Sequence, residues 1–147
     1  MPSCAPAEGP LDAATNYQDL WWAAPAASES GWGINLTQQG GVIFGTWFTY
    51  DADGTPLWLS VTATPVGRAS TSQGAPAAWS GSLVRTTGPA FSAMPFDPKL
   101  IARTVVGDAN FTFTDGNHAT FAYTVNGVTQ AKPITREVFA APGTVCR

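Results

Sequence analysis

Aromatic side chains are the residues of this sequence best suited to hold a ligand. The 147 residues include six Trp, eight Phe and three Tyr, and such rings dominate small-molecule sites in proteins. Trp47 and Trp58 are the strongest candidates, because small or polar residues share their strand faces and would leave room beside a large ring. The other candidate ligand-binding residues are two aromatics and two polar groups that would anchor a ligand: Trp79, Tyr50, Asn35 and Glu29.

Catalytic and metal-binding patterns are incomplete in this sequence. His118 is the single histidine and lies beside a turn, so a catalytic triad would depend on it and a zinc site would lack a second imidazole. No G-x-S-x-G motif and no phosphate-binding glycine loop are present. The run 51–54, Asp-Ala-Asp-Gly, begins like a calcium loop, but Thr62 occupies the position of the closing Glu. We therefore expect a hairpin turn there, no metal, no cofactor and no catalytic residue.

Cys4 and Cys146 lie almost at the two ends of the chain. We expect them to form a disulfide; the alternative is two unrelated thiols in a reducing cytosol. Because disulfides persist in oxidising compartments, we expect a secreted or periplasmic bacterial protein. No signal peptide is recognisable at the start, and we expect that one was removed on export.

The length and charge of the chain limit the functions that it can have. The chain has the size of one domain, with 44% hydrophobic residues and only 12% charged residues. Its net charge is −3 and its basic residues are scattered, which disfavours nucleic acid as a partner. No apolar run is long enough for a transmembrane helix.

Short alternating segments separated by Gly, Pro, Asn and Asp predict an all-β fold. We expect residues 1–18 to form an N-terminal arm and 19–147 a single barrel domain. Segments 65–77 and 87–98 are interpreted as loops, the second packed down by its Pro and Phe residues. The expected strands are 31–38, 42–50, 56–64, 78–86, 100–107, 109–114, 118–125 and 128–139.

About eight strands joined mostly by hairpins are typical of an up-and-down antiparallel meander. Eight strands suffice to close a barrel that is filled or that holds one small ligand, and closure removes exposed edges. We therefore expect a closed barrel, with a two-sheet sandwich as the alternative. Segment 42–50 is apolar on both faces, so the interior face is not fixed; we expect Trp32, Phe44 and Phe48 in the core.

Charged and bulky residues inside the expected strands also raise a question of orientation. Arg85 and Arg136 would be costly in a barrel wall unless they are paired or exposed, and we expect both to face outward. The alternative is that one of them seals a barrel end over an aromatic ring or holds an anionic ligand. Trp21 and Trp22 precede the expected strands; because adjacent side chains of a strand face opposite ways, we expect that they do not both face one core.

The run 29–59, ESGWGINLTQQGGVIFGTWFTYDADGTPLWL, resembles a module of secreted proteobacterial proteins, and segments 80–91, 112–116 and 120–127 match the same pattern. That module occurs singly or in tandem, usually with no assigned function. The chain is also weakly similar to the calycins, the lipocalin and avidin barrels, through Gly45-Thr46-Trp47 and Arg136 near the end. This second resemblance implies only a barrel architecture.

Three functions remain. The first is a non-catalytic binding module with an aromatic-lined pocket or mouth for a small apolar ligand, a sugar or a peptide. The second is an interaction or inhibitor domain acting through loops 65–77 and 87–98. The third is a cofactor-free barrel enzyme, such as a cyclase or isomerase, with Glu29, Tyr50 or Tyr123 in a deep pocket. Exposed tryptophans at a barrel end would also suit a homodimer interface.

Overall fold

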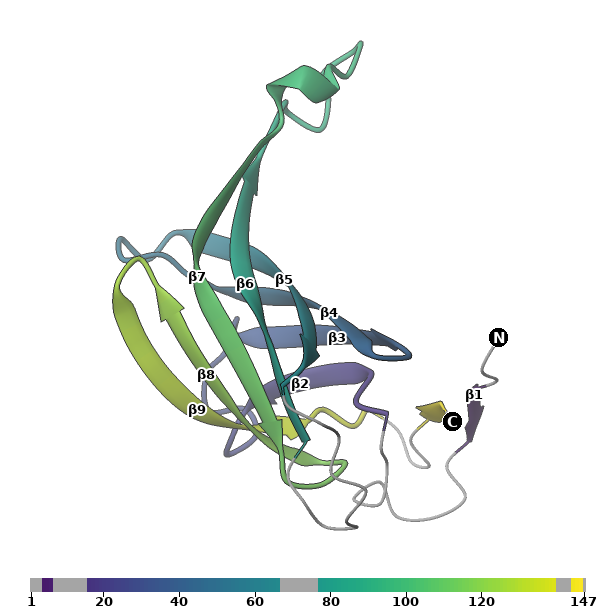
Figure 1. Cartoon of the computed structure of the whole chain (residues 1–147). Coiled ribbons are helices and arrows are strands. Elements are labelled where there is room, and N and C mark those ends of the chain that lie inside the picture. The colour runs from purple at the N-terminus through teal and green to yellow at the C-terminus, as the bar shows by residue number, and fades with distance from the viewer. Residues whose placement is uncertain (1–3, 7–15, 67–76, 140–143, 147) are drawn as a thin grey trace.

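The computed structural model describes residues 4–6, 16–66, 77–139 and 144–146, with side chains for 16–66 and 77–139. Eight antiparallel strands form a closed barrel in sequence order, and the last pairs with the first (Figure 1). The barrel prediction is confirmed and the sandwich alternative is wrong. The strands are β2 Asp19–Ala23, β3 Gly33–Gln39, β4 Val42–Tyr50, β5 Pro56–Pro65, β6 Ala77–Thr87, β7 Ala102–Phe113, β8 His118–Val125 and β9 Val128–Arg136.

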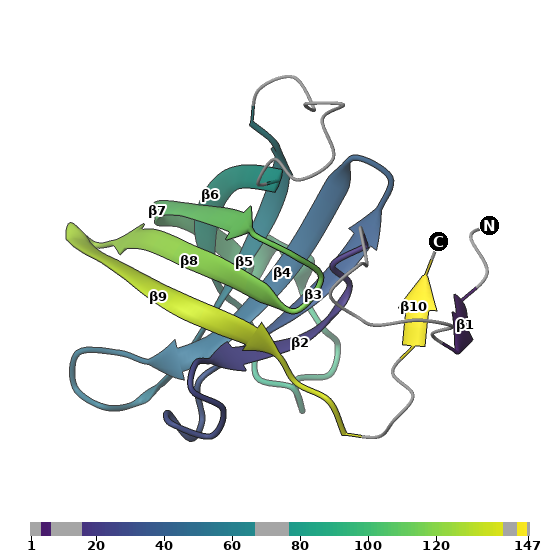
Figure 2. The same ribbon diagram turned by 90° about the horizontal axis from the view of Figure 1, so that it is seen from below.

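A second, two-stranded sheet joins β1 (Cys4–Pro6) to β10 (Thr144–Cys146). It lies beside the barrel (Figure 2). Its antiparallel register places the Cα of Cys4 opposite that of Cys146. The disulfide itself stays a prediction. Part of the expected arm 1–18 is thus a strand, and residues 7–15 lie outside the described residues.

The barrel interior is filled by side chains that alternate with outward-facing ones along each strand. Its core combines large rings with branched aliphatic residues, and small alanines fill the gaps between them. The fully buried side chains of largest volume are Trp21, Phe111, Phe113, Phe121, Ile34, Ile43, Leu59, Leu83, Ile134 and Val61.

Strand β4 shows which of its two apolar faces is interior. Trp47 lies opposite Ile34 of β3 and Leu59 of β5, and all three are buried. Directly opposite residues share a sheet face, so this register turns the Trp47 side inward. Phe44 and Phe48 face outward and are about half exposed, so their expected place in the core is wrong, whereas Trp32 is buried as expected.

Two strands differ from the sequence-based expectation. Asp19–Ala23, which we did not expect as a barrel strand, is β2, with Trp21 buried inside and Trp22 on the other face. The two strands expected at 100–107 and 109–114 are one strand, β7, with a register shift against β6. Gly107 lies at this irregularity, where an added Cβ would come 1.7 Å from the Thr124 carbonyl oxygen. The strand count of eight is therefore right, although its members differ.

The hairpin between β6 and β7 projects away from the barrel (Figure 1). It carries the short 3-10 helix η2 (Pro98–Leu100), capped by the Asp97 side chain. Phe91 is fully exposed and Met94 is 94% exposed, so the expectation that 87–98 packs down is wrong. Of the loop expected at 65–77, residues 67–76 lie outside the described residues. In the described part of the chain, no helix is long and apolar enough to cross a membrane.

Candidate functional site

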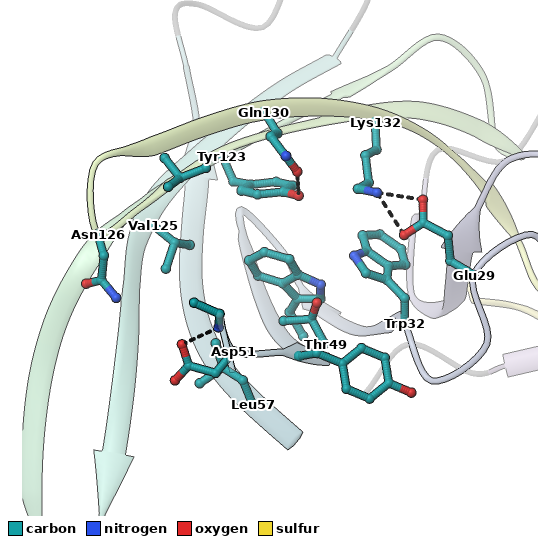
Figure 3. Close-up of a pocket in the computed structure, with 14 residues that line it drawn as sticks. Glu29, Trp32, Thr49, Asp51, Leu57, Tyr123, Val125, Asn126, Gln130 and Lys132 are labelled. Carbon is teal, nitrogen blue, oxygen red and sulfur yellow. Dashed lines mark hydrogen bonds and ion pairs between the residues drawn. The ribbon is translucent and has the colours of Figure 1, made fainter. Parts of the chain in front are cut away.

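One end of the barrel holds an open pocket of about 380 Å³ (Figure 3). It lies where the β4–β5 and β8–β9 turns meet, and its lining comes from strands on opposite sides of the barrel. Aromatic and aliphatic side chains line its interior, and polar groups stand toward the rim. The lining residues are Glu29, Trp32, Trp47, Thr49, Tyr50, Asp51, Ala52, Leu57, Tyr123, Val125, Asn126, Val128, Gln130 and Lys132.

An aromatic cluster separates the pocket from the packed core. Trp47 contacts Trp32, Phe121 and Tyr123, with ring centroids at 6.1, 5.1 and 4.5 Å respectively. The rings meet edge-to-face or tilted, the arrangements that aromatic quadrupoles favour. Alternation along β4 and β8 explains the cluster, because Trp47, Phe121 and Tyr123 all occupy interior positions. The pocket therefore has an aromatic base.

Two hydrogen-bond donors in this base have no partner. The indole Nε1 atoms of Trp32 and Trp47 are buried and unpaired, although the residues are only 7% and 3% exposed. Figure 3 shows the Trp32 nitrogen directed toward the pocket interior. The core indole of Trp21, in contrast, donates to the Tyr17 carbonyl oxygen at 2.9 Å. A buried donor without an acceptor is costly, about 1–3 kcal/mol, so each such group needs an explanation. Trp22 Nε1, outside the pocket, is also buried and unpaired.

The charged groups of the rim are paired. Lys132 Nζ lies 2.5 and 2.7 Å from the two Glu29 carboxylate oxygens. Asp51 accepts from Arg85 Nη1 at 3.0 Å. Every charged side chain of the lining is therefore in an ion pair, and the pocket offers no unpaired charge to a ligand.

The two tyrosine hydroxyls of the pocket are also engaged. Tyr123 donates to Gln130 Oε1 at 2.6 Å, and Tyr50 donates to the Ser30 carbonyl oxygen at 3.1 Å. Burial raises the pKa of Tyr123, and the nearby Glu29 charge raises it further. The Tyr123 hydroxyl is therefore neutral at physiological pH and serves as a fixed polar group.

The structure brings three of the six predicted ligand-binding residues together. Trp47, Tyr50 and Glu29 line the pocket. Trp58 and Asn35 are exposed on the outer face of the barrel, and Trp79 is buried in the interior without lining the pocket. Trp58 faces outward because it lies opposite Phe48 in the β4–β5 register.

Sequence reasoning missed several pocket residues. Trp32 was assigned only to the core, and the rim residues Gln130 and Lys132 were not considered. The missed signal is the Asn126–Gly127 hairpin, which fixes Tyr123 opposite Gln130. With Tyr123 inside, the register would have placed Gln130 at the same end of the barrel.

The other end of the barrel is closed by Arg136, which is 4% exposed. Its guanidinium lies 5.1 Å from the Trp21 ring centroid and pairs with Asp19 at 2.9 Å. It also donates to the carbonyl oxygens of Gly116, Gln18 and Asn16. The expected outward orientation of Arg136 is wrong, and the alternative of a seal over an aromatic ring is confirmed. Arg85 is exposed as expected.

The turns at 51–54 and 115–118 are held by hydrogen bonds typical of turns, and none of these bonds indicates a ligand site. At 51–54, Gly54 N donates to the Asp51 carbonyl oxygen, and Asp53 accepts from the Thr55 side chain and backbone. His118 pairs with Asp115 at 2.9 Å on an exposed turn. Among the residues that the structure describes, no three His, Cys, Asp or Glu side chains are grouped to hold a metal.

Comparison of the chain with protein-family models, curated proteins and solved structures finds no match. Fold and pocket by themselves define an eight-stranded up-and-down barrel with one sealed end and one open, aromatic-lined end.

Proposed function

We propose that this protein binds a small, largely apolar molecule in the open end of its barrel. The observation that carries the proposal is the pocket of about 380 Å³ above the Trp32–Trp47–Tyr123 base. This volume falls in the range of about 300–1,000 Å³ typical of small-molecule sites. Its apolar walls favour a compact apolar ligand over a sugar or a peptide, which would need more hydrogen-bonding groups.

The state of the polar groups supports binding rather than catalysis. A barrel enzyme would use Glu29, Tyr50 or Tyr123 as an acid or base. Glu29 is held by Lys132, and both hydroxyls already donate to oxygen acceptors. A general base must be within hydrogen-bond reach of the proton that it abstracts, and these groups are directed at protein partners instead. We therefore place this protein among the non-catalytic binding modules.

Binding of N-phenyl-1-naphthylamine, an uncharged fluorescent probe, tests the proposal. We expect saturable probe fluorescence with the wild-type protein. Val125→Trp, which fills the pocket from β8, should weaken binding at least tenfold. The matched control is Trp58→Phe on the outer face. Equal binding to all three proteins would place the probe elsewhere, and absence of binding to the wild type would contradict the proposal.

A second candidate function is protein interaction through the β6–β7 hairpin, which the exposure of Phe91 and Met94 favours. Large apolar side chains that are fully exposed at the tip of a projection are typical of contact surfaces. The simplest partner is a second copy of the chain. Sedimentation velocity over a range of concentrations should then show a dimer, and the Phe91→Ser, Met94→Ser double variant should be monomeric. A wild-type monomer at all concentrations would exclude self-association.

A further inference from the structure

The two unpartnered indole donors at the base of the pocket indicate the chemistry of its ligand. Among the buried side-chain polar atoms without a partner, those that line the pocket are Trp32 Nε1 and Trp47 Nε1. Both are donors, and neither residue is more than a tenth exposed. What this site lacks is therefore a hydrogen-bond acceptor.

The lining supplies no acceptor of its own to these indoles. The Glu29 carboxylate accepts from Lys132, and Gln130 Oε1 accepts from Tyr123. The ring centroids of Trp32 and Trp47 are 6.1 Å apart, and the rings are inclined by 63°. Two donors on neighbouring rings suit one oxygen atom, since a carbonyl oxygen has two lone pairs.

The rim indicates that this acceptor is uncharged. Glu29 and Lys132 neutralise each other, and Asp51 is neutralised by Arg85. Burial of an anionic head group would cost far more desolvation free energy than burial of a neutral carbonyl group. The pocket has no unpaired cation that would offset this cost. The apolar walls, Leu57 and Val125 among them, suit the rest of such a molecule.

We propose that the ligand is a compact, uncharged, mostly apolar molecule that carries a carbonyl-type oxygen, and that this oxygen accepts hydrogen bonds from Trp32 Nε1 and Trp47 Nε1. The inference rests on the proposed function and narrows its ligand class. The rival is that both N–H groups are directed at neighbouring ring faces, such as Phe121, 5.1 Å from Trp47 between centroids. Such contacts are weak and need no ligand.

Three naphthalenes of similar shape test the inference: 2-acetylnaphthalene, 2-ethylnaphthalene and 2-naphthoate. Their dissociation constants are measured by quenching of tryptophan fluorescence. Satisfying two buried donors should make the ketone bind at least about tenfold more tightly than the hydrocarbon, or about 1.4 kcal/mol. Equal affinities would overturn the acceptor inference while leaving pocket binding intact. Tighter binding of naphthoate would overturn the uncharged head, and absence of all binding would overturn the proposed function as well.

Variants of the two tryptophans test whether their indole N–H groups cause the preference for the ketone. Trp32→Phe and Trp47→Phe keep a ring but remove the N–H, and each should reduce the preference for the ketone at least threefold. Trp79→Phe, buried outside the pocket, is the matched control.

Indole ¹H–¹⁵N resonances of the wild-type protein give a readout that does not depend on the folding of any variant. The ketone should move the Trp32 and Trp47 signals downfield, while the Trp21 signal, already bonded to Tyr17, stays in place. Unmoved signals at saturation with the ketone would overturn the inference.

Discussion

At the scale of single residues, Arg136 is a charged side chain that is buried, at 4% exposure, and makes several hydrogen bonds. A buried guanidinium is costly unless its donors are satisfied. Here the charge is met by Asp19 and the Trp21 face, and the remaining donors by backbone carbonyl oxygens. Several of these partners come from the segment before β2 and from the β7–β8 turn, so one side chain holds the closed end together.

We expect Arg136→Lys to lower the free energy of unfolding by about 2–4 kcal/mol, although it keeps the charge. A lysine ammonium cannot match the planar fork of donors, so buried carbonyl oxygens would lose their partners. Arg85→Lys, in the exposed pair with Asp51, is the control and should cost less than about 1 kcal/mol. Urea unfolding measures both. A change of less than about 0.5 kcal/mol for Arg136→Lys would show that its hydrogen bonds matter little.

The raised pKa values of two tyrosines lead us to expect a loss of stability at alkaline pH. Burial raises the pKa of Tyr17, an effect that Arg136 opposes and Asp115 reinforces, and burial with the Glu29 charge raises that of Tyr123. The unfolded chain releases these protons near pH ~10, where the folded protein still retains them. The contribution of these two tyrosines to the free energy of unfolding is therefore fully present below about pH 10. It is lost as the pH rises through their pKa values in the folded protein. Urea unfolding from pH 8 to 11 should show a shallower fall for Tyr17→Phe, Tyr123→Phe; an unchanged slope would contradict the assignment.

Half of the six ligand-binding residues predicted from the sequence line the pocket. Trp47 was found because Gly45 and Thr49 share its face. The same criterion failed for Trp58, because small neighbours on a strand do not show whether their face is interior. The polar residues Asn35 and Thr37 mark the outer face of β3, and pairing through the 39–42 turn would have extended that assignment to β4. Which face of a strand points inward thus depends on its register with neighbouring strands, and the sequence of one strand alone does not show it.

At the scale of elements, two glycines lie at places where the predicted strands are compared with the observed ones: one in the β8–β9 hairpin, which was predicted correctly, and one in β7, which was predicted as two strands. Asn126–Gly127 correctly predicted the β8–β9 hairpin, since Asn126 and Gly127 both have positive φ. The expected strands 100–107 and 109–114 are one strand, β7, and Gly107 lies at its register shift against β6. β2 was missed because a five-residue strand with adjacent Trp21 and Trp22 shows no clear alternation.

We expect Gly107→Ala to destabilise the barrel by about 1–3 kcal/mol, the usual cost of overpacking. An added Cβ would lie 1.7 Å from the Thr124 carbonyl oxygen, so β7 and β8 would have to separate. Gly41→Ala, where no atom lies within 4 Å of an added Cβ, is the control. Thermal unfolding of the two variants should differ by several degrees. Equal midpoints would mean that the strands adjust without cost.

At the scale of the whole molecule, closure of the sheet was predictable but the difference between its two ends was not. The number of strands and their hairpin connections suffice for a barrel. Which end is sealed depends on where Arg136 and Tyr17 meet the core, and Tyr17 stacks on Phe113 with ring centroids 3.7 Å apart. These contacts join residues far apart in the sequence, so no local pattern reveals them.

The β1–β10 sheet carries the last prediction. Its register places Cys4 and Cys146 opposite each other, the arrangement in which an antiparallel pair can be cross-linked. A disulfide there would close nearly the whole chain into one loop, and loops of this size give about 4–5 kcal/mol in the chain-entropy model. We expect the purified protein to be two hydrogens lighter than its reduced form by mass spectrometry.

The Cys4→Ser, Cys146→Ser variant should keep the barrel, because β2 and β9 pair directly, but should unfold at a lower urea concentration. It should match the reduced wild type, which separates loss of the cross-link from any effect of the serines. Free thiols in the oxidised wild type would contradict the cross-link and remove the sequence-based reason for expecting export.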